Sequence, residues 1–178
     1  QAANLSDFAA KAQVRARVWQ TKKPELIEPE KGFDLPEFDI EIDIDLENSQ
    51  AALQEMDAEQ SVGRDQVYLY GYGIHDRTKD KDWRTAHIDS FGNYEDTDEA
   101  EYEVLLSMWQ LLESEVAKAE SASQTIGIFH YHVHEVTWWR NFARNHKGKA
   151  GVPTLEEVED FTEEYFVDLL DYSKQVAL

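Results

Sequence analysis

The stretch Phe38-Asp39-Ile40-Glu41-Ile42-Asp43-Ile44-Asp45-Leu46-Glu47 decides the fold, because apolar and acidic side chains alternate along it without a break. A period of two predicts a strand with one buried face and one polar face. Ionised carboxylates at alternate positions project from the same face, about 6.5–7 Å apart along the chain, and they repel one another. Two arrangements relieve this repulsion: the acidic face lies in water, or hard cations bind against it.

The order of the remaining elements predicts the architecture around this strand. Two further strands are expected at 67–74 and 83–91, and together the three strands predict an antiparallel meander. Asp98, with Glu101 three residues later, has the spacing of a helix N-cap. Strands and helices alternate in the rest of the chain, and strand–helix–strand units predict strands that add to the sheet in parallel. The expected elements are strand 125–130, helix 134–146, helix 155–162, strand 165–168 and a final helix.

The sequence therefore predicts an α/β fold, a mixed five-stranded sheet of antiparallel meander plus parallel strands, with helices on both faces. The acidic strand is expected to be the first and central one. Solvation of either face is harder to arrange at the centre of a sheet, and this favours bound cations. A polar stretch from 48 to 66 is expected to form a mobile loop.

The first 36 residues differ in character from the rest. A weak amphipathic helix is expected over 5–20, and three of the four prolines fall in an extended linker over 22–36. We therefore divide the chain into residues 1–36, a helix and linker from a preceding region, and residues 37–178, the main domain. Because the sequence starts at Gln1 and stops inside the predicted final helix, we expect a fragment whose main domain is incomplete at its C-terminus.

Composition limits the partners of the chain. The 178 residues contain no cysteine and no apolar run of the roughly 18 residues that span a bilayer, so we expect a cytoplasmic protein without a membrane segment. The net charge of −20 repels nucleic acid at long range, which argues against a simple DNA-binding module. Bound metal cations reverse the field locally, so a metal-dependent enzyme acting on nucleic acid partly escapes this objection.

The segment His130-Tyr131-His132-Val133-His134-Glu135 lies at a predicted strand-to-helix junction. Ligands of open α/β sheets bind at the carboxyl ends of strands, so a junction of this kind is a candidate site. Glu135 is expected in the first helical turn, where the helix dipole favours its charged form. The three alternate histidines have two other interpretations: a zinc site completed by the glutamate, or packing and capping at a crowded junction. Trp138 and Trp139, which follow, are expected in the core, with base stacking as the alternative.

Four sequence blocks in this order resemble the predicted RecB-family nucleases, which carry an RNase H-like exonuclease domain of the DnaQ type (the DEDD group). The resemblance runs from about Phe38 to the C-terminus. Its blocks are Ile42-Asp43-Ile44-Asp45-Leu46-Glu47-Asn48, Val67-Tyr68-Leu69-Tyr70-Gly71, Phe129-His130-Tyr131-His132-Val133-His134-Glu135 and Phe166-Val167-Asp168-Leu169-Leu170.

The resemblance implies a metal-dependent hydrolase of phosphodiester bonds, of the 3′–5′ exonuclease type. Asp45-Leu46-Glu47 matches the D-x-E pair of the first strand, and Phe38-Asp39-Ile40-Glu41 fits the same pattern. Glu135 matches the acidic residue that opens a later helix, as glutamate rather than the usual aspartate, and Asp168 matches the last block, where a helix-capping role is equally common. The implied catalytic residues are thus Asp45, Glu47, Glu135 and Asp168, and the implied metal ligands are Asp43, Asp45, Glu47 and Glu135.

The expected cofactor is Mg²⁺ or Mn²⁺, acting as a two-metal pair. The expected partners are nucleic acid, with DNA favoured over RNA, and other domains of a longer protein. The family places a final aspartate, with a nearby His or Tyr, in a further C-terminal helix, and the sequence shows no such motif. An alternative therefore stays open: a catalytically silent RNase H-like domain that serves as a scaffold or recruiting surface.

Overall fold

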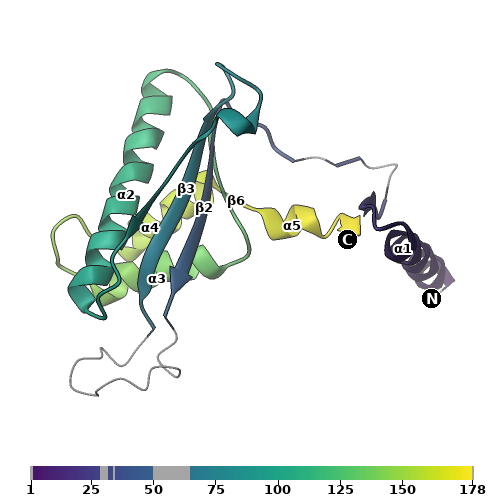
Figure 1. The fold of residues 1–178 in the computed structure, drawn as a ribbon, viewed down its shortest axis with the longest axis horizontal. Coiled ribbons are helices and arrows are strands. Elements are labelled where there is room, and N and C mark those ends of the chain that lie inside the picture. The colour runs from purple at the N-terminus through teal and green to yellow at the C-terminus, as the bar shows by residue number, and fades with distance from the viewer. Residues whose placement is uncertain (1, 29–31, 34, 50–64, 178) are drawn as a thin grey trace. The chain divides into compact units, whose positions relative to one another are not determined.

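The computed structural model describes residues 2–28, 32–33, 35–49 and 65–177 (Figure 1). Its helices are α1 (Ala2–Thr21), η3 (Trp83–Thr85, a 3₁₀ helix), α2 (Asp98–Ser121), α3 (His134–Asn145), α4 (Leu155–Tyr165) and α5 (Leu169–Ser173). Its strands are β1 (Glu25–Leu26), β2 (Ile40–Asn48), β3 (Val67–Asp76), β4 (His87–Gly92), β5 (Ile126–His130), β6 (Phe166–Asp168) and β7 (Val176–Ala177).

Two compact units make up the chain. The terminal unit is Gln1–Pro36 together with Asp168–Leu178, and the sheet unit is Glu37–Val167. The last eleven residues belong to the same unit as the N-terminal segment, which ends at Pro36. The predicted loop over 48–66 falls largely outside the described residues.

The large sheet has the strand order β4-β3-β2-β5-β6, with β2 at its centre as predicted. Strands β2, β3 and β4 form the antiparallel meander, and β5 runs parallel to β2. Helical segments lie on both sides of this sheet: α2 flanks one side, and η3 lies on the other, where the Trp83 ring approaches Gly73 of β3 (Figure 1). The predicted α/β class, with a mixed five-stranded sheet, is confirmed.

Hydrophobic burial fixes which face of β2 points inward. Ile40, Ile42, Ile44 and Leu46 are buried in one core cluster with residues of α2 and α3. Fully burying a side chain of this kind stabilises the fold by about 1.5–3 kcal/mol. A slip of one residue would exchange these side chains for carboxylates, so the register of β2 is strongly specified.

Two predicted boundaries are wrong, for local reasons. The N-cap of α2 is Thr97, whose hydroxyl accepts from the Ala100 N–H, and Asp98 is the first helical residue. The strand expected from residue 83 begins at His87. The Asp82 carboxylate accepts the Arg84 N–H and starts the 3₁₀ turn of η3, which interrupts the extended backbone.

The terminal unit is built on α1 and a two-stranded antiparallel sheet of β1 and β7. Val14 and Val18 of α1 are buried against Ile27. The predicted N-terminal helix is confirmed, but the predicted linker contains β1, and the chain after α5 turns into β7 rather than continuing as a helix. No helix in the described part of the chain is long and apolar enough to span a bilayer.

Candidate metal-binding site

The acidic face of β2 is divided into two regions. Because side chains alternate along a strand, Asp39, Glu41, Asp43, Asp45 and Glu47 share the side opposite the core cluster. We call Asp39 and Glu41 the closed end of this face, and Asp43, Asp45 and Glu47 the open end. The two ends differ in every contact that the carboxylates make.

Hydrogen bonds from the protein surround the closed end. The Asp39 carboxylate accepts from the backbone N–H and the hydroxyl of Thr125, at 2.9 and 3.0 Å. The Glu41 carboxylate accepts from Arg77 Nη1 and from Trp83 Nε1, both at 2.8 Å, and its side chain is buried. The hydrogen bond to Glu41, and then the charge of Glu41, raise the pKa of the Arg77 guanidinium above its ordinary value. These carboxylates are therefore structural.

Aromatic rings cover the closed end as well. The Trp83 ring lies 5.0 Å from the buried His75 ring, measured between centroids. Phe38 packs over Gly127 of β5, so closely that a Cβ atom there would lie 2.3 Å from the ring carbons. Water and ions are thereby kept from Glu41.

The open end has neither kind of cover. Asp43, Asp45 and Glu47 are exposed. In the described residues, no hydrogen-bond donor or basic side chain pairs with any of these three carboxylates. Gly71 of β3 pairs with Asp45 and places no side chain beside it, and a Cβ at Gly71 would meet only the Asp45 carbonyl oxygen, at 3.8 Å. The open end therefore has both free carboxylate oxygens and room next to them.

The surroundings of Asp43 disfavour its ionised form. Partial burial, and then the charge of Glu41, raise the pKa of the Asp43 carboxyl above its ordinary value. A nearby negative charge favours the neutral form of an acid, and a bound cation would reverse that preference.

Glu135 lies on the other side of the sheet. It opens α3 as predicted, but its carboxylate is buried, with Oε2 3.5 Å from Nδ1 of His130. The charge on Glu135, after burial itself, raises the pKa of Tyr70 well above its ordinary value, and Tyr70 belongs to the core cluster. The structure thus places Asp43, Asp45 and Glu47 on one face of the sheet and Glu135 on the opposite one.

The histidines of this segment do not converge. The Nδ1–H of buried His130 donates to the carbonyl oxygen of His132, at 2.6 Å. His134 is exposed at the start of α3, with its ring edge against Trp138. Trp138 and Trp139 are both buried in the core cluster. Across the described residues, no three side chains of His, Cys, Asp or Glu are grouped closely enough to enclose a metal ion.

Asp168 ends β6 and caps α5. Its carboxylate accepts from the backbone N–H of Leu170 at 2.8 Å, which is an N-cap interaction. Of the two roles that the sequence left open for Asp168, the structure shows helix capping.

Known proteins offer no match. No family model, curated protein or solved structure is similar to this chain. The resemblance to RecB-family nucleases therefore stays a prediction carried by the four sequence blocks.

One buried contact between a glutamate and a histidine was not anticipated from the sequence. Glu101 of α2 and His146 are both buried, with Nε2 and Oε2 2.9 Å apart, and the other oxygen of Glu101 accepts the Val67 N–H. The pair joins the end of α3 to α2 and the start of β3. Glu101 lies on the apolar side of α2, between Ala100 and Val104, and this position was the available signal.

Proposed function

We propose that the sheet unit is an RNase H-like, metal-dependent nuclease domain whose cation site is the open end of β2. The observation that carries the proposal is the contrast along one strand face: Asp39 and Glu41 are satisfied by the protein, whereas Asp43, Asp45 and Glu47 have no protein partner in the described residues. Unpaired carboxylates in a row repel one another, and a divalent cation relieves that repulsion.

The same contrast favours one of the two D-x-E pairs. Asp39 accepts two hydrogen bonds from Thr125 on its Oδ2 atom, and Glu41 uses both of its oxygens in hydrogen bonds to Arg77 and Trp83. This pair therefore has fewer oxygens left for a metal. No group in the described residues uses the carboxylate oxygens of Asp45 and Glu47. This supports Asp45-Leu46-Glu47 as the metal-binding pair, with Asp43 beside it.

The donor set suits magnesium or manganese. Mg²⁺ is typically held by one or two carboxylates, and water and substrate phosphate oxygens complete its shell, so a cage of three protein ligands is not required. Bound divalent ions supply charge neutralisation at the phosphate and a water molecule that is easier to deprotonate. In this proposal Asp45 and Glu47 would hold the ions, and the bare backbone at Gly71 would leave room for the nucleic-acid strand. Glu135 supports α3 from the core side.

The test is cleavage of DNA and RNA labelled at the 5′ or 3′ end, with Mg²⁺ or Mn²⁺, by the whole chain. Asp45→Asn and Glu47→Gln should reduce the rate by about 100-fold or more, which corresponds to about 2.7 kcal/mol of lost transition-state stabilisation. Asp39→Asn is the matched control, because it removes the same charge from the same strand face at a position bonded to Thr125. Equal cleavage by wild type, Asp45→Asn and Glu47→Gln would remove these residues from the mechanism.

A second candidate is a catalytically silent scaffold of the same fold. The position of Glu135 favours it, because the predicted fourth ligand is buried against His130 on the other face of the sheet. A silent domain would show no metal-dependent cleavage of any of these substrates, and its thermal unfolding would be unchanged by millimolar Mn²⁺. For either candidate we expect a reducing, cytoplasmic location, since the sequence contains no cysteine.

A further inference from the structure

The charge of the chain is distributed unevenly between its two units. The terminal unit holds seven Lys and Arg residues and seven Asp and Glu residues, so it is neutral. The sheet unit holds ten basic and thirty acidic residues, and the net charge of −20 therefore lies entirely on it. A polyanion that approaches this chain meets the least repulsion at the terminal unit.

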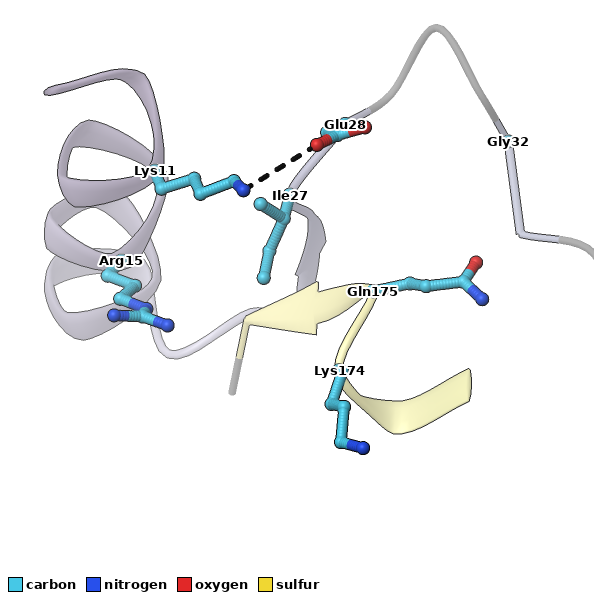
Figure 2. Close-up of a pocket in the computed structure, with 7 residues that line it drawn as sticks. All are labelled: Lys11, Arg15, Ile27, Glu28, Gly32, Lys174 and Gln175. Atoms are coloured by element: carbon cyan, nitrogen blue, oxygen red, sulfur yellow. Dashed lines mark ion pairs between the residues drawn. The ribbon is translucent and has the colours of Figure 1, made fainter. Parts of the chain in front are cut away.

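Within the terminal unit, basic side chains gather around a cavity of about 540 Å³. Lys11 and Arg15 of α1 and Lys174 line it, together with Glu28, the one acid among the described lining residues (Figure 2). Lys174 also forms an ion pair with Asp171, at 2.7 Å. Lys11 forms an ion pair with Glu28 across 3.7 Å. Arg15 has no ion pair or hydrogen bond in the described structure. A volume of this size is within the range of ordinary ligand sites.

The basic residues continue along one side of α1. Lys11, Arg15 and Trp19 are spaced four residues apart, so they form a stripe on the helix surface, and Lys22 follows at its end. Trp19 is 76% exposed, and Lys22 Nζ lies 3.8 Å from the centroid of its ring. The neighbouring stripe, Val14 and Val18, is buried. The basic stripe extends about 15 Å along the helix axis.

We propose that this stripe and its cavity bind the phosphodiester backbone of a single-stranded nucleic acid. The guanidinium of Arg15 matches a phosphate in two hydrogen bonds, Lys11 and Lys174 add positive charge, and the exposed Trp19 ring offers a surface on which a base stacks. This inference rests on the proposed function for its choice of ligand. It also explains how a strongly acidic nuclease would retain a polyanionic substrate.

The experiment measures fluorescence anisotropy of a labelled single-stranded oligonucleotide with the whole chain, in EDTA, over a range of salt. The triple variant Lys11→Gln, Arg15→Gln and Lys174→Gln should weaken binding on the order of tenfold at 50 mM salt, and should lower the slope of log K against log salt by about two. The matched control is Lys79→Gln, Lys118→Gln and Lys147→Gln, which removes the same charge from the sheet unit and should leave the slope unchanged.

Trp19→Ala supplies an independent measurement, since base stacking quenches tryptophan fluorescence. Wild-type fluorescence should fall on binding, and the fall should be smaller in Trp19→Ala. Equal weakening in the two triple variants, or no binding by the wild type at 20 mM salt, overturns the inference. Because EDTA removes the metal, the binding result is independent of cleavage. If the chain binds the oligonucleotide normally but does not cleave nucleic acid, only the nuclease proposal is overturned. If it cleaves nucleic acid but the triple variant of the stripe binds as well as wild type, only this inference is overturned.

Discussion

The closed and open ends of β2 hold the same kind of side chain on the same strand face, yet their surroundings are opposite. At the closed end, Glu41 is buried and bonded to Arg77 and Trp83. At the open end, Asp45 is exposed and faces a glycine. The difference shows that the alternation of a strand determines which way a carboxylate points, whereas residues distant in sequence determine whether it is structural or available for a ligand.

The largest expected effect is on stability at the closed end. Glu41→Ala leaves the Trp83 indole N–H and the Arg77 guanidinium without their acceptor, and should lower the free energy of unfolding by about 3 kcal/mol. Glu47→Ala, at the open end, should change it by about 0.5 kcal/mol or less. Urea denaturation followed by tryptophan fluorescence measures both. A similar cost for the two variants would contradict the division of the face.

Two glycines on the strands that flank β2, Gly127 of β5 and Gly71 of β3, extend the comparison to packing. A Cβ at Gly127 would overlap the Phe38 ring at 2.3 Å, so Gly127→Ala should cost about 1–3 kcal/mol as the ring is displaced. Gly71→Ala, beside Asp45, has room for its methyl group and should cost about 0.5 kcal/mol or less. Denaturation midpoints with unchanged m-values would establish that only stability differs. Should Gly71→Ala prove as costly as Gly127→Ala, the space assigned to the open end does not exist.

Metal binding tests the open end directly. At a Mn²⁺ concentration ten times the dissociation constant, the folded state should gain about 1.4 kcal/mol, seen as a rise in Tm. Asp45→Asn and Glu47→Gln should lose this gain. Asp39→Asn should keep it while starting from a lower Tm, because only its bonds to Thr125 are lost. A Mn²⁺ response that disappears in Asp39→Asn and persists in Asp45→Asn would reverse the assignment of the two ends.

The sequence could predict those features of the fold and of the candidate site that depend on local periodicity. The period of two predicts that the side chains of Ile42 and Ile44 point inward and that those of Asp43 and Asp45 point outward. The order of the strands predicts the central position of β2. The distinction between the two ends depends on Trp83 and Arg77, which are more than thirty residues away and reach Glu41 through the folding of β3 and η3. No local pattern encodes that contact.

The position of Glu135 illustrates a second limit. The sequence places it correctly in the first turn of α3, but the direction of its side chain depends on how the helix rotates about its axis. Glu135 and Trp139 are four residues apart and share one helix face, so burial of Trp139 turns Glu135 toward the core. A large aromatic side chain thereby overrides the expected approach of the carboxylate to the acidic strand.

The smallest expected effect concerns the pH dependence of Asp43, the residue of the open end that is next to Glu41 on the strand face. Its pKa is raised in the folded state by partial burial and by Glu41, so the ionised form destabilises the fold relative to the unfolded chain. At pH 7 Asp43→Asn should therefore be more stable than wild type, by about 0.5 kcal/mol or less. As the pH falls through the raised pKa, folded wild type binds its proton before the unfolded chain does, and the advantage of Asp43→Asn should decrease and vanish below the ordinary pKa. Thermal unfolding of both proteins from pH 7 to about pH 3 measures this difference, with Asp89→Asn on the exposed strand β4 as the control. An advantage of Asp43→Asn that grows as the pH falls would mean that Asp43 is stabilised as an anion, and that the repulsion ascribed to the open end is absent.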